Sequence, residues 1–318
     1  MRRPALLLLA SCLPAAAAAP GEQPFPAPDR SRILREEKTT YLVDGSVTIP
    51  RGVEISIQKD VYIKAKGGGA ARIVVEGNLE VHGVSAREVI FEGVTVVPAA
   101  SFQKIQLDTC IFRGGGLATA EGSAAEGNLQ VQGCRFESGA RIQLAVVAGS
   151  LELLDGSAGG TVRLLGVVPE GKTNRVKAVL RGFHPGGLHA EGLADLTVRL
   201  CAFGEGPVTL KDVGDLTFDG CKVEAKEISF LQSKAGGFAR TKVMKCDLYS
   251  KRIVFRSPAD PKVSDTVVLD KCWFEGERDL EALAKRIVDV ADDKANNVTV
   301  KVLNPMERPH EMAGKLNR

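Results

Sequence analysis

Apolar and polar residues alternate in short runs along most of the chain, and Gly, Asp and Asn separate the runs. The pattern is clearest at residues 45–50, 51–57 and 71–81. Alternation with period two and an excess of β-branched residues are typical of strands and not of helices. The pattern therefore predicts an all-β protein built from many short strands.

Cysteines mark a repeat within this pattern. They recur after separations of 24, 67, 20, 25 and 26 residues, and the longest separation is about three repeats. Apolar or β-branched residues stand five and three positions before each cysteine, and an apolar residue stands two positions after it. A frame of this length predicts a solenoid whose coils pair only with their neighbours. The cysteines expected to stack inside it are Cys110, Cys134, Cys201, Cys221, Cys246 and Cys272.

A two-residue interruption of the alternation precedes each cysteine, as at Asp108-Thr109 and Asp219-Gly220. We interpret the interruption as a bend between two strands, where one residue must accept an unusual backbone angle. The cysteine-free stretch is expected to bend in the same way at 153–156, 164–167 and 180–183. Residues 45–97 are expected to add two or three coils.

The first nineteen residues are predicted to be a signal peptide. Arg2 and Arg3 precede an apolar stretch, and small residues follow it. Residues 9–12 resemble a lipoprotein box, which makes Cys12 a candidate for lipidation; cleavage near Ala18 or Ala19 is the alternative.

The remaining chain divides into three predicted parts. Residues 20–38 are proline-rich and are expected to form a linker. Residues 39–276 are predicted to form the solenoid. Residues 277–318 are predicted to contain an amphipathic helix at about 279–292, which would close the end of the solenoid, then one strand and a polar tail. Helical spacing is shown by Leu280, Leu283, Ala284, Ile287, Val288 and Ala291.

The segment from Tyr41 to Phe91 resembles the opening coils of right-handed parallel β-helix proteins of the pectin-lyase-like type. The resemblance rests on residues 47–57, 75–83 and 89–91, and the cysteine frame extends it to Gly276. It implies a right-handed parallel β-helix, a fold used by polysaccharide lyases, glycosidases, esterases, adhesins and surface proteins. A shared fold does not fix an activity.

Composition narrows the possible functions. The 318 residues carry a formal net charge of +3 with 44% hydrophobic residues. This small charge, without an Arg-rich arm, argues against a nucleic-acid partner. No catalytic constellation and no cofactor motif is found. His184 and His189 offer two ligands without a third, so no metal site is expected. The cysteines are expected to be free, buried thiols.

The cysteine frame indicates which side chains on three successive coils face outward together. Trp273 and Tyr249 would offer an aromatic surface for a sugar ring. Glu224 and Glu275 would lie roughly 9–10 Å apart, near the upper limit for carboxylates that invert a glycosidic bond. Ordinary solvated surface charge is the alternative. The full patch is Lys222, Glu224, Asp247, Tyr249, Trp273 and Glu275.

Arg240 and Lys242 are expected to point outward from the strand before a bend. Together with neighbouring basic residues between 226 and 262 they predict a basic stripe that would hold an anionic polysaccharide or lipid head group. A basic edge that prevents edge-to-edge aggregation is the alternative.

The leading hypothesis is an exported, non-catalytic protein of the cell envelope, periplasm or medium that binds carbohydrate or has a structural role. The protein would associate with a membrane only through its signal peptide or a lipid anchor. Two alternatives are an enzyme that cleaves polysaccharide and a self-assembling scaffold.

Overall fold

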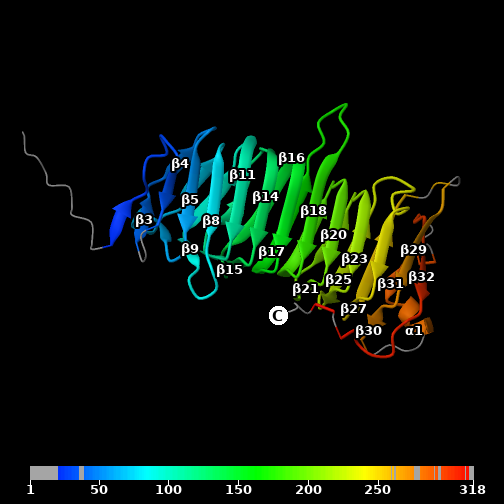
Figure 1. The fold of residues 1–318 in the computed structure, drawn as a ribbon. Helices are drawn as coiled ribbons and strands as arrows, with labels where there is room; N and C mark the ends of the chain where they lie inside the picture. The colour runs from blue at the N-terminus through cyan, green and yellow to red at the C-terminus, as the bar shows by residue number, and fades with distance from the viewer. Residues whose placement is uncertain are drawn as a thin grey trace, which may run out of the picture.

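The computed structural model describes residues 21–35, 39–258, 260, 263–275, 280–289, 291–292, 295–311 and 313–314. The predicted signal peptide 1–19, with Cys12, lies outside the described residues. The chain winds into an elongated parallel β-helix of about 10 turns, as the successive strands in Figure 1 show. This confirms the predicted all-β solenoid.

Each coil contributes strands to three faces, and every strand pairs in parallel with its equivalents in the neighbouring coils. Face 1 consists of β2 (Arg32–Leu34), β5 (Glu54–Gln58), β8 (Asn78–His82), β11 (Ser101–Asp108), β14 (Ala125–Gln132), the second half of β16 (Arg141–Leu154), β18 (Arg175–Arg181), β20 (Asp195–Arg199), β23 (Asp215–Asp219), β26 (Thr241–Met244), β29 (Asp265–Asp270) and β32 (Val298–Leu303).

Face 2 follows face 1 along the chain. It consists of β1 (Glu22–Pro24), β3 (Thr40–Val43), β6 (Tyr62–Ala65), β9 (Val89–Glu92), β12 (Cys110–Arg113), β15 (Arg135–Phe136) and the first parts of β17 (Ser157–Gly166) and β19 (His184–Glu191). It ends in a four-stranded sheet of β21 (Ala202–Phe203), β24 (Lys222–Val223), β27 (Asp247–Leu248) and β30 (Trp273–Phe274).

Face 3 completes the coil. It consists of β4 (Ser46–Ile49), β7 (Ala71–Val75), β10 (Val94–Pro98), β13 (Gly116–Ala118), the first half of β16, the last parts of β17 and β19, β22 (Val208–Lys211), β25 (Glu227–Leu231), β28 (Arg252–Arg256) and β31 (Ile287–Val288). The described helices are η1 (Lys66–Gly68) and α1 (Leu280–Ala284). Among the described residues, no helix is long and apolar enough to cross a membrane.

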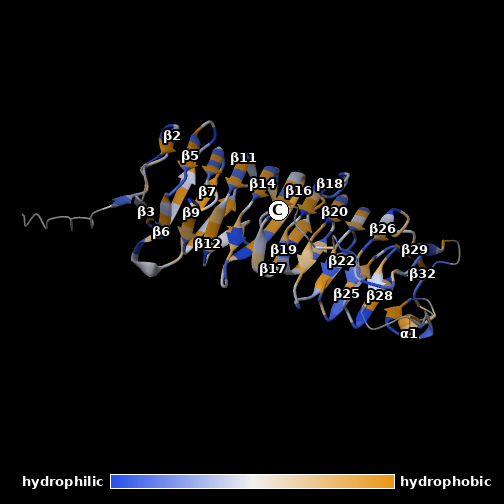
Figure 2. Ribbon diagram, turned by 60° about the horizontal axis from the view of Figure 1, so that its bottom comes forward, coloured by the Kyte–Doolittle hydropathy of each residue, from blue (hydrophilic) through white to orange (hydrophobic). Residues whose placement is uncertain are grey.

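Alternation along the strands gives the solenoid its inside and outside. Hydrophobic and hydrophilic residues alternate along many strands in Figure 2, as expected where one side of a strand is buried. In β8, for example, Leu79 and Val81 are fully buried, whereas Asn78, Glu80 and His82 are partly exposed. The period-two pattern in the sequence is therefore the direct signature of the coil interior.

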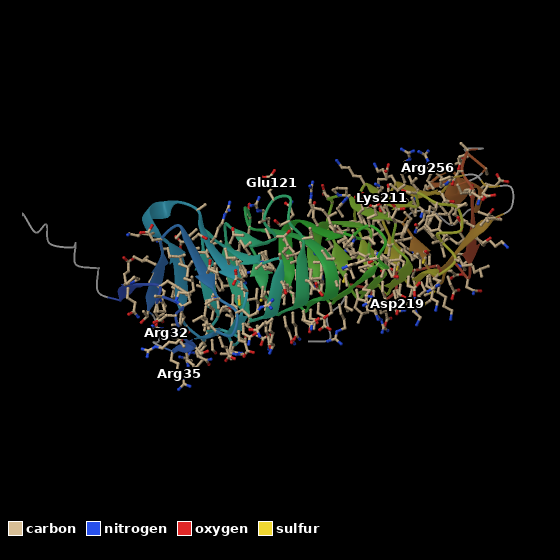
Figure 3. The ribbon with its side chains drawn as sticks, turned by 90° about the horizontal axis from the view of Figure 1, so that it is seen from above. Arg32, Arg35, Glu121, Lys211, Asp219 and Arg256 are labelled. Atoms are coloured by element: carbon tan, nitrogen blue, oxygen red, sulfur yellow. The ribbon has the colours of Figure 1, made fainter. Side chains whose placement is uncertain are left out.

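The solenoid begins and ends outside the predicted range 39–276. The expectation that 20–38 is only a linker is wrong, because β1 pairs with β3 and β2 pairs with β5. Phe25 contributes a buried ring that lies edge-on to Tyr41, with centroids 6.4 Å apart. Arg32 and Arg35 lie at this N-terminal end (Figure 3).

The bend before each cysteine is confirmed. The residue immediately before it has a positive φ in all six cases: Thr109 (52°), Gly133 (63°), Leu200 (53°), Gly220 (63°), Lys245 (52°) and Lys271 (52°). Asp155 (51°) and Gly182 (59°) form the same bend in the cysteine-free coils. The bend predicted at 164–167 is wrong, because Leu164 lies within β17 and pairs with Leu144 on face 3.

The cysteines form the predicted interior ladder, and all six are buried free thiols. Each thiol lies near the carbonyl two residues earlier, at the bend. Cys134 Sγ, for instance, lies 3.4 Å from the carbonyl of Gln132 and 3.3 Å from that of Leu107 in the preceding coil. A small apolar residue with a weak donor suits this place, because the bend leaves buried carbonyl groups to satisfy.

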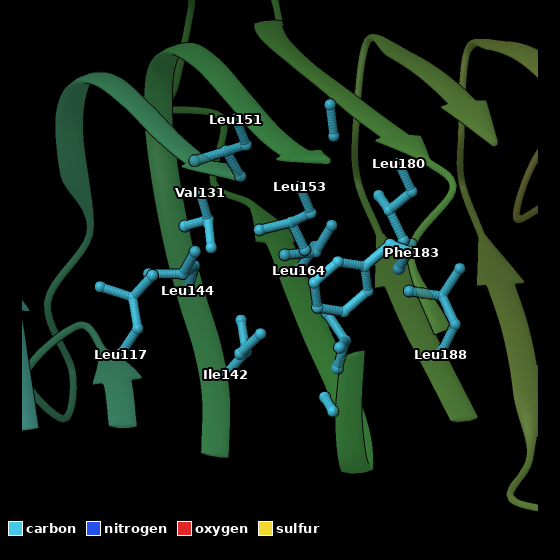
Figure 4. Packing of buried hydrophobic residues seen from close by; sticks show 14 of the residues in the cluster. Leu117, Val131, Ile142, Leu144, Leu151, Leu153, Leu164, Leu180, Phe183 and Leu188 are labelled. Carbon is cyan, nitrogen blue, oxygen red and sulfur yellow. The ribbon is translucent and has the colours of Figure 1, made fainter. Parts of the chain in front are cut away.

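The core is a continuous column of side chains from all three faces. Leu144 and Leu153, from opposite halves of β16, point into the same interior in Figure 4. The apolar position two residues after the cysteine, or after its counterpart Val89, forms stacks. Phe91, Phe112 and Phe136 overlap with centroids 4.7 and 4.6 Å apart. Each coil therefore buries its apolar residues mainly against its neighbours.

The amphipathic helix predicted at about 279–292 is wrong over most of its length. The described helix is α1, which ends at Ala284, and Ile287 and Val288 then form β31. Ile287 pairs with Ile253 of β28. These β-branched residues extend the ladder of face 3. Pairing with the edge of β28 therefore outweighs the helical preference that their spacing indicates.

Candidate binding surfaces

The structure brings together the six patch residues predicted on successive coils. Lys222, Asp247 and Trp273 pair in register across β24, β27 and β30 on face 2. Glu224, Tyr249 and Glu275 follow two residues later in the same coils. The cysteine frame was therefore sufficient to align these coils correctly.

Lys222 links the aromatic and acidic parts of this patch. Its Nζ lies 2.6 Å from Glu224 Oε1 and 5.1 Å from the centroid of the Tyr249 ring. The hydrogen bond to Glu224 raises the pKa of Lys222. The Tyr249 ring meets Trp273 edge-on, with centroids 5.0 Å apart and an angle of 65° between the rings. These contacts hold the two half-buried aromatic side chains in a fixed arrangement.

Part of the patch is covered, contrary to expectation. The C-terminal segment 304–314, which we name the strap, runs back along face 2 to a point near β21 (Figure 1). The backbone N–H of His310 donates to Asp247 Oδ1 at 2.7 Å. Asp247 is only 3% exposed, although the coil frame predicted a solvated carboxylate. The frame could not reveal the strap because the strap is polar and lacks alternation.

Burial raises the pKa of Asp247 above its ordinary value, while the hydrogen bond from His310 and the charge of Lys222 act in the opposite direction. Perturbed carboxylates of this kind occur at catalytic sites. Here, however, one carboxylate oxygen already accepts a bond from the strap. In this arrangement, burial and the strap leave little of the Asp247 carboxylate open to a ligand.

Arg240 and Lys242 do not belong to the same surface, because they lie before and within β26 on face 1. Arg240 is bound by Asp215, with Nη1 and Oδ1 2.9 Å apart. The proposed continuous stripe is also interrupted on face 3, where Arg252 pairs with Glu227 at 3.4 Å. The prediction of one basic stripe is therefore wrong, because it followed the sequence and ignored the division of each coil into faces.

A hollow on face 3, which the sequence did not indicate, has a volume of about 860 Å³. The loop 119–124 overhangs it, and its floor contains the short side chains of Thr95, Val97 and Ala118. Glu121, on this loop, lies along the same side of the solenoid as Lys211 and Arg256 and opposite Asp219 (Figure 3). We call this hollow the arginine groove because Arg72 and Arg141 also line it.

The arginines flank the floor of the groove. Arg72, Thr95, Gly116 and Arg141 are aligned across β7, β10, β13 and β16. Strand spacing places the two arginine backbones about 14 Å apart. Thr95 and Gly116 have short side chains or none, so the surface is hollow between the arginines.

A third arginine adjoins the groove, since Arg163 pairs with Gln143, which lines it. Within the described part of the chain, the guanidinium groups of Arg72, Arg141 and Arg163 have no hydrogen-bonding or ion-pair partner. Many charges on neighbouring coils are paired, such as Lys104 with Glu80. Because Glu121 is the one carboxylate among the described residues of the lining, the groove carries an excess of positive charge.

Sequence reasoning missed the groove because face 3 has no marker comparable to the cysteine. Arg72 and Arg141 are far apart in the chain, and the coils between them differ in length. The only usable signal was the outward position of each arginine in an alternating run, which many surface residues share.

His184 and His189 both lie on β19. His189 lies 3.4 Å from Glu191, and burial lowers the pKa of His184. In the described ranges, no group of three or more His, Cys, Asp or Glu side chains is arranged to hold a metal ion.

Neither comparison with known proteins names a relative: no family model matches the chain, and no curated protein matches it. The function must therefore be inferred from the arginine groove and the patch on face 2.

Proposed function

We propose that this is an exported, non-catalytic protein that holds an acidic polysaccharide in the arginine groove. The observation that carries the proposal is a hollow of about 860 Å³ lined by two arginines and adjoined by a third, whose guanidinium groups have no acidic partner. Each guanidinium offers a planar set of donors that fits a carboxylate or sulfate group in a bidentate manner.

The shape of the groove favours a chain over a small anion. Arg72 and Arg141 are separated by about three strand spacings, roughly 14 Å. A polymer with repeated acidic groups offers each arginine its own carboxylate or sulfate, whereas a single small anion would have to be shared between both guanidinium groups. The small side chains of Thr95 and Ala118 leave room for sugar rings between them.

The lining argues against cleavage by glycoside hydrolysis. Glu121 is the one carboxylate among the described residues that line the groove. Glycoside hydrolysis usually needs two carboxyl groups on opposite sides of the bond. Support for export comes from the signal-like residues 1–19, and the resemblance of the opening coils to pectin-lyase-like proteins favours a polysaccharide.

The test is a titration of the chain with polygalacturonate, alginate and neutral dextran. We expect binding to both acidic polymers and not to dextran, with affinity falling as salt rises. Arg72→Ala and Arg141→Ala are each expected to weaken binding about tenfold, which corresponds to about 1.4 kcal/mol. Arg252→Ala is the matched control, because Arg252 lies on the same face but is paired with Glu227.

Equal losses in the Arg252 variant would show that general charge, and not the groove, holds the polymer. Binding of neutral dextran, with no binding of either acidic polymer, would overturn the proposal that the ligand is acidic. New reducing or unsaturated chain ends in the same samples would identify an enzyme and overturn the non-catalytic part of the proposal.

A further inference from the structure

The strap is attached to face 2 at regular intervals. The backbone N–H groups of Met306, His310 and Gly314, four residues apart, donate to Cys272 O, Asp247 Oδ1 and Gly220 O at 3.0, 2.7 and 3.0 Å. Their acceptors lie in three successive coils. The strap therefore follows the row that contains Lys222, Asp247 and Trp273.

Few of the strap's described side chains are buried. Of its described residues only Ala313 is buried, whereas Pro305, Glu307, Arg308, Pro309 and Glu311 are exposed. A segment with so little buried apolar area opens locally at a much lower free energy than the coils beneath it. We therefore expect the strap to open before the coils beneath it.

The far end of the strap depends on one glycine. Gly314 has φ of +67°, and a Cβ atom there would lie 2.9 Å from Lys222 Cβ and 3.0 Å from Ala202 Cβ. Any other residue would be strained and would clash with β21 and β24. A single substitution can therefore dislodge the strap without altering a coil.

We propose that the strap is a detachable cover and that the surface beneath it binds the ring of a neutral sugar. A pyranose ring has an apolar C–H face, which suits the Trp273 and Tyr249 rings, and hydroxyls that suit a carboxylate and an ammonium group. Asp247 lies in register between Lys222 and Trp273, and Lys222 Nζ lies 5.1 Å from the centroid of the Tyr249 ring. This site lies on face 2 and does not depend on the arginine groove.

Trp273 is the only tryptophan in the chain, so its fluorescence reports directly on this site. The experiment compares the full chain with Gly314→Val in acrylamide quenching of Trp273, in hydrogen exchange of the strap amides and in titrations with cellohexaose and xylohexaose. Gly171→Val is the matched control, because Gly171 also has a positive φ of +72° but has no neighbour within 4 Å.

Gly314→Val is expected to expose Trp273 to acrylamide, to speed exchange of the His310 amide about tenfold and to create binding of a hexaose. The control is expected to match the wild type in all three measurements. Adding Trp273→Ala to Gly314→Val should abolish the hexaose binding. If Gly314→Val does not fold, His310→Pro removes the N–H that Asp247 accepts and is tested in the same way.

Two results would overturn the proposal that the strap is a cover. In one, the strap amides of Gly314→Val exchange faster while the quenching of Trp273 stays unchanged. In the other, the wild type binds a hexaose as tightly as Gly314→Val does. The sugar site is overturned if the uncovered surface binds neither hexaose. None of these outcomes bears on the acidic polymer, which binds on another face.

Discussion

The hydroxyl of Ser257 donates to Asp265 Oδ2 at 2.8 Å, and the two residues are only 0% and 2% exposed. The same carboxylate accepts the backbone N–H groups of Gly236, at 2.9 Å, and Phe238, at 3.3 Å. It thereby ties the segment between β25 and β26 to the start of β29. Every donor in this network is satisfied by one buried side chain.

Asp265→Asn is expected to destabilise the fold by about 2–3 kcal/mol, because an amide NH₂ would replace one acceptor and face a buried donor. Unfolding in guanidinium chloride, provided that the slope against denaturant concentration is unchanged, would measure the change in the free energy of unfolding. Asp212→Asn is the control: Asp212 also accepts two bonds from Ser233, but at the surface. A loss of equal size in both variants would contradict the role of burial.

The bends and the ladder could be predicted from the sequence because both are local. A cysteine with apolar residues at fixed offsets specifies which side of the strand faces inward, and Gly220 or Asp155 marks the residue with positive φ. The patch on face 2 followed from the same frame. Lys222 and Trp273 consequently lie where they were expected.

The predictions from sequence failed where a contact between residues far apart in the chain determines the structure. Ile287 has helical spacing to its neighbours, but it faces the unpaired edge of β28 and joins that sheet. Asp247 is polar and occupies an outward position, yet the distant His310 covers it. The arginine groove forms only because β7, β10, β13 and β16 pair side by side, and no repeated residue in the sequence indicates their register.

An inward-facing charge lies at the N-terminal end of the solenoid. Arg32 pairs with Ile55 and lies on the same side of β2 as the buried Leu34, but its guanidinium binds Asp29 at 2.7 Å. Arg32→Leu would expose an apolar coil end and is expected to cause concentration-dependent association in light scattering. Arg35→Leu is the control, and a monomeric Arg32 variant would show that other residues block stacking.

Oxidation and labelling should reveal the cysteine ladder. Burial raises the pKa of the Cys110 and Cys221 thiols well above the ordinary value. In a chain lacking residues 1–19, none of the six thiols is expected to react with a thiol reagent at about pH 8 before unfolding, and all six should react in denaturant. Fewer than six in denaturant would indicate disulfides and contradict the free ladder.

The raised pKa of Asp247 gives a pH dependence with a definite sign. Because burial holds the folded pKa above the unfolded value, the folded state binds more protons between the two values. The free energy of unfolding therefore falls as pH rises through this window. Asp247→Asn retains an acceptor for His310 but carries no charge, so it should unfold at a higher temperature than the wild type at about pH 7. The difference should vanish at about pH 3, below the unfolded pKa, where both side chains are neutral. Thermal unfolding of both chains across this range would measure it, and a variant less stable at neutral pH would show that the ionised carboxylate gains more from the His310 N–H than it loses by burial.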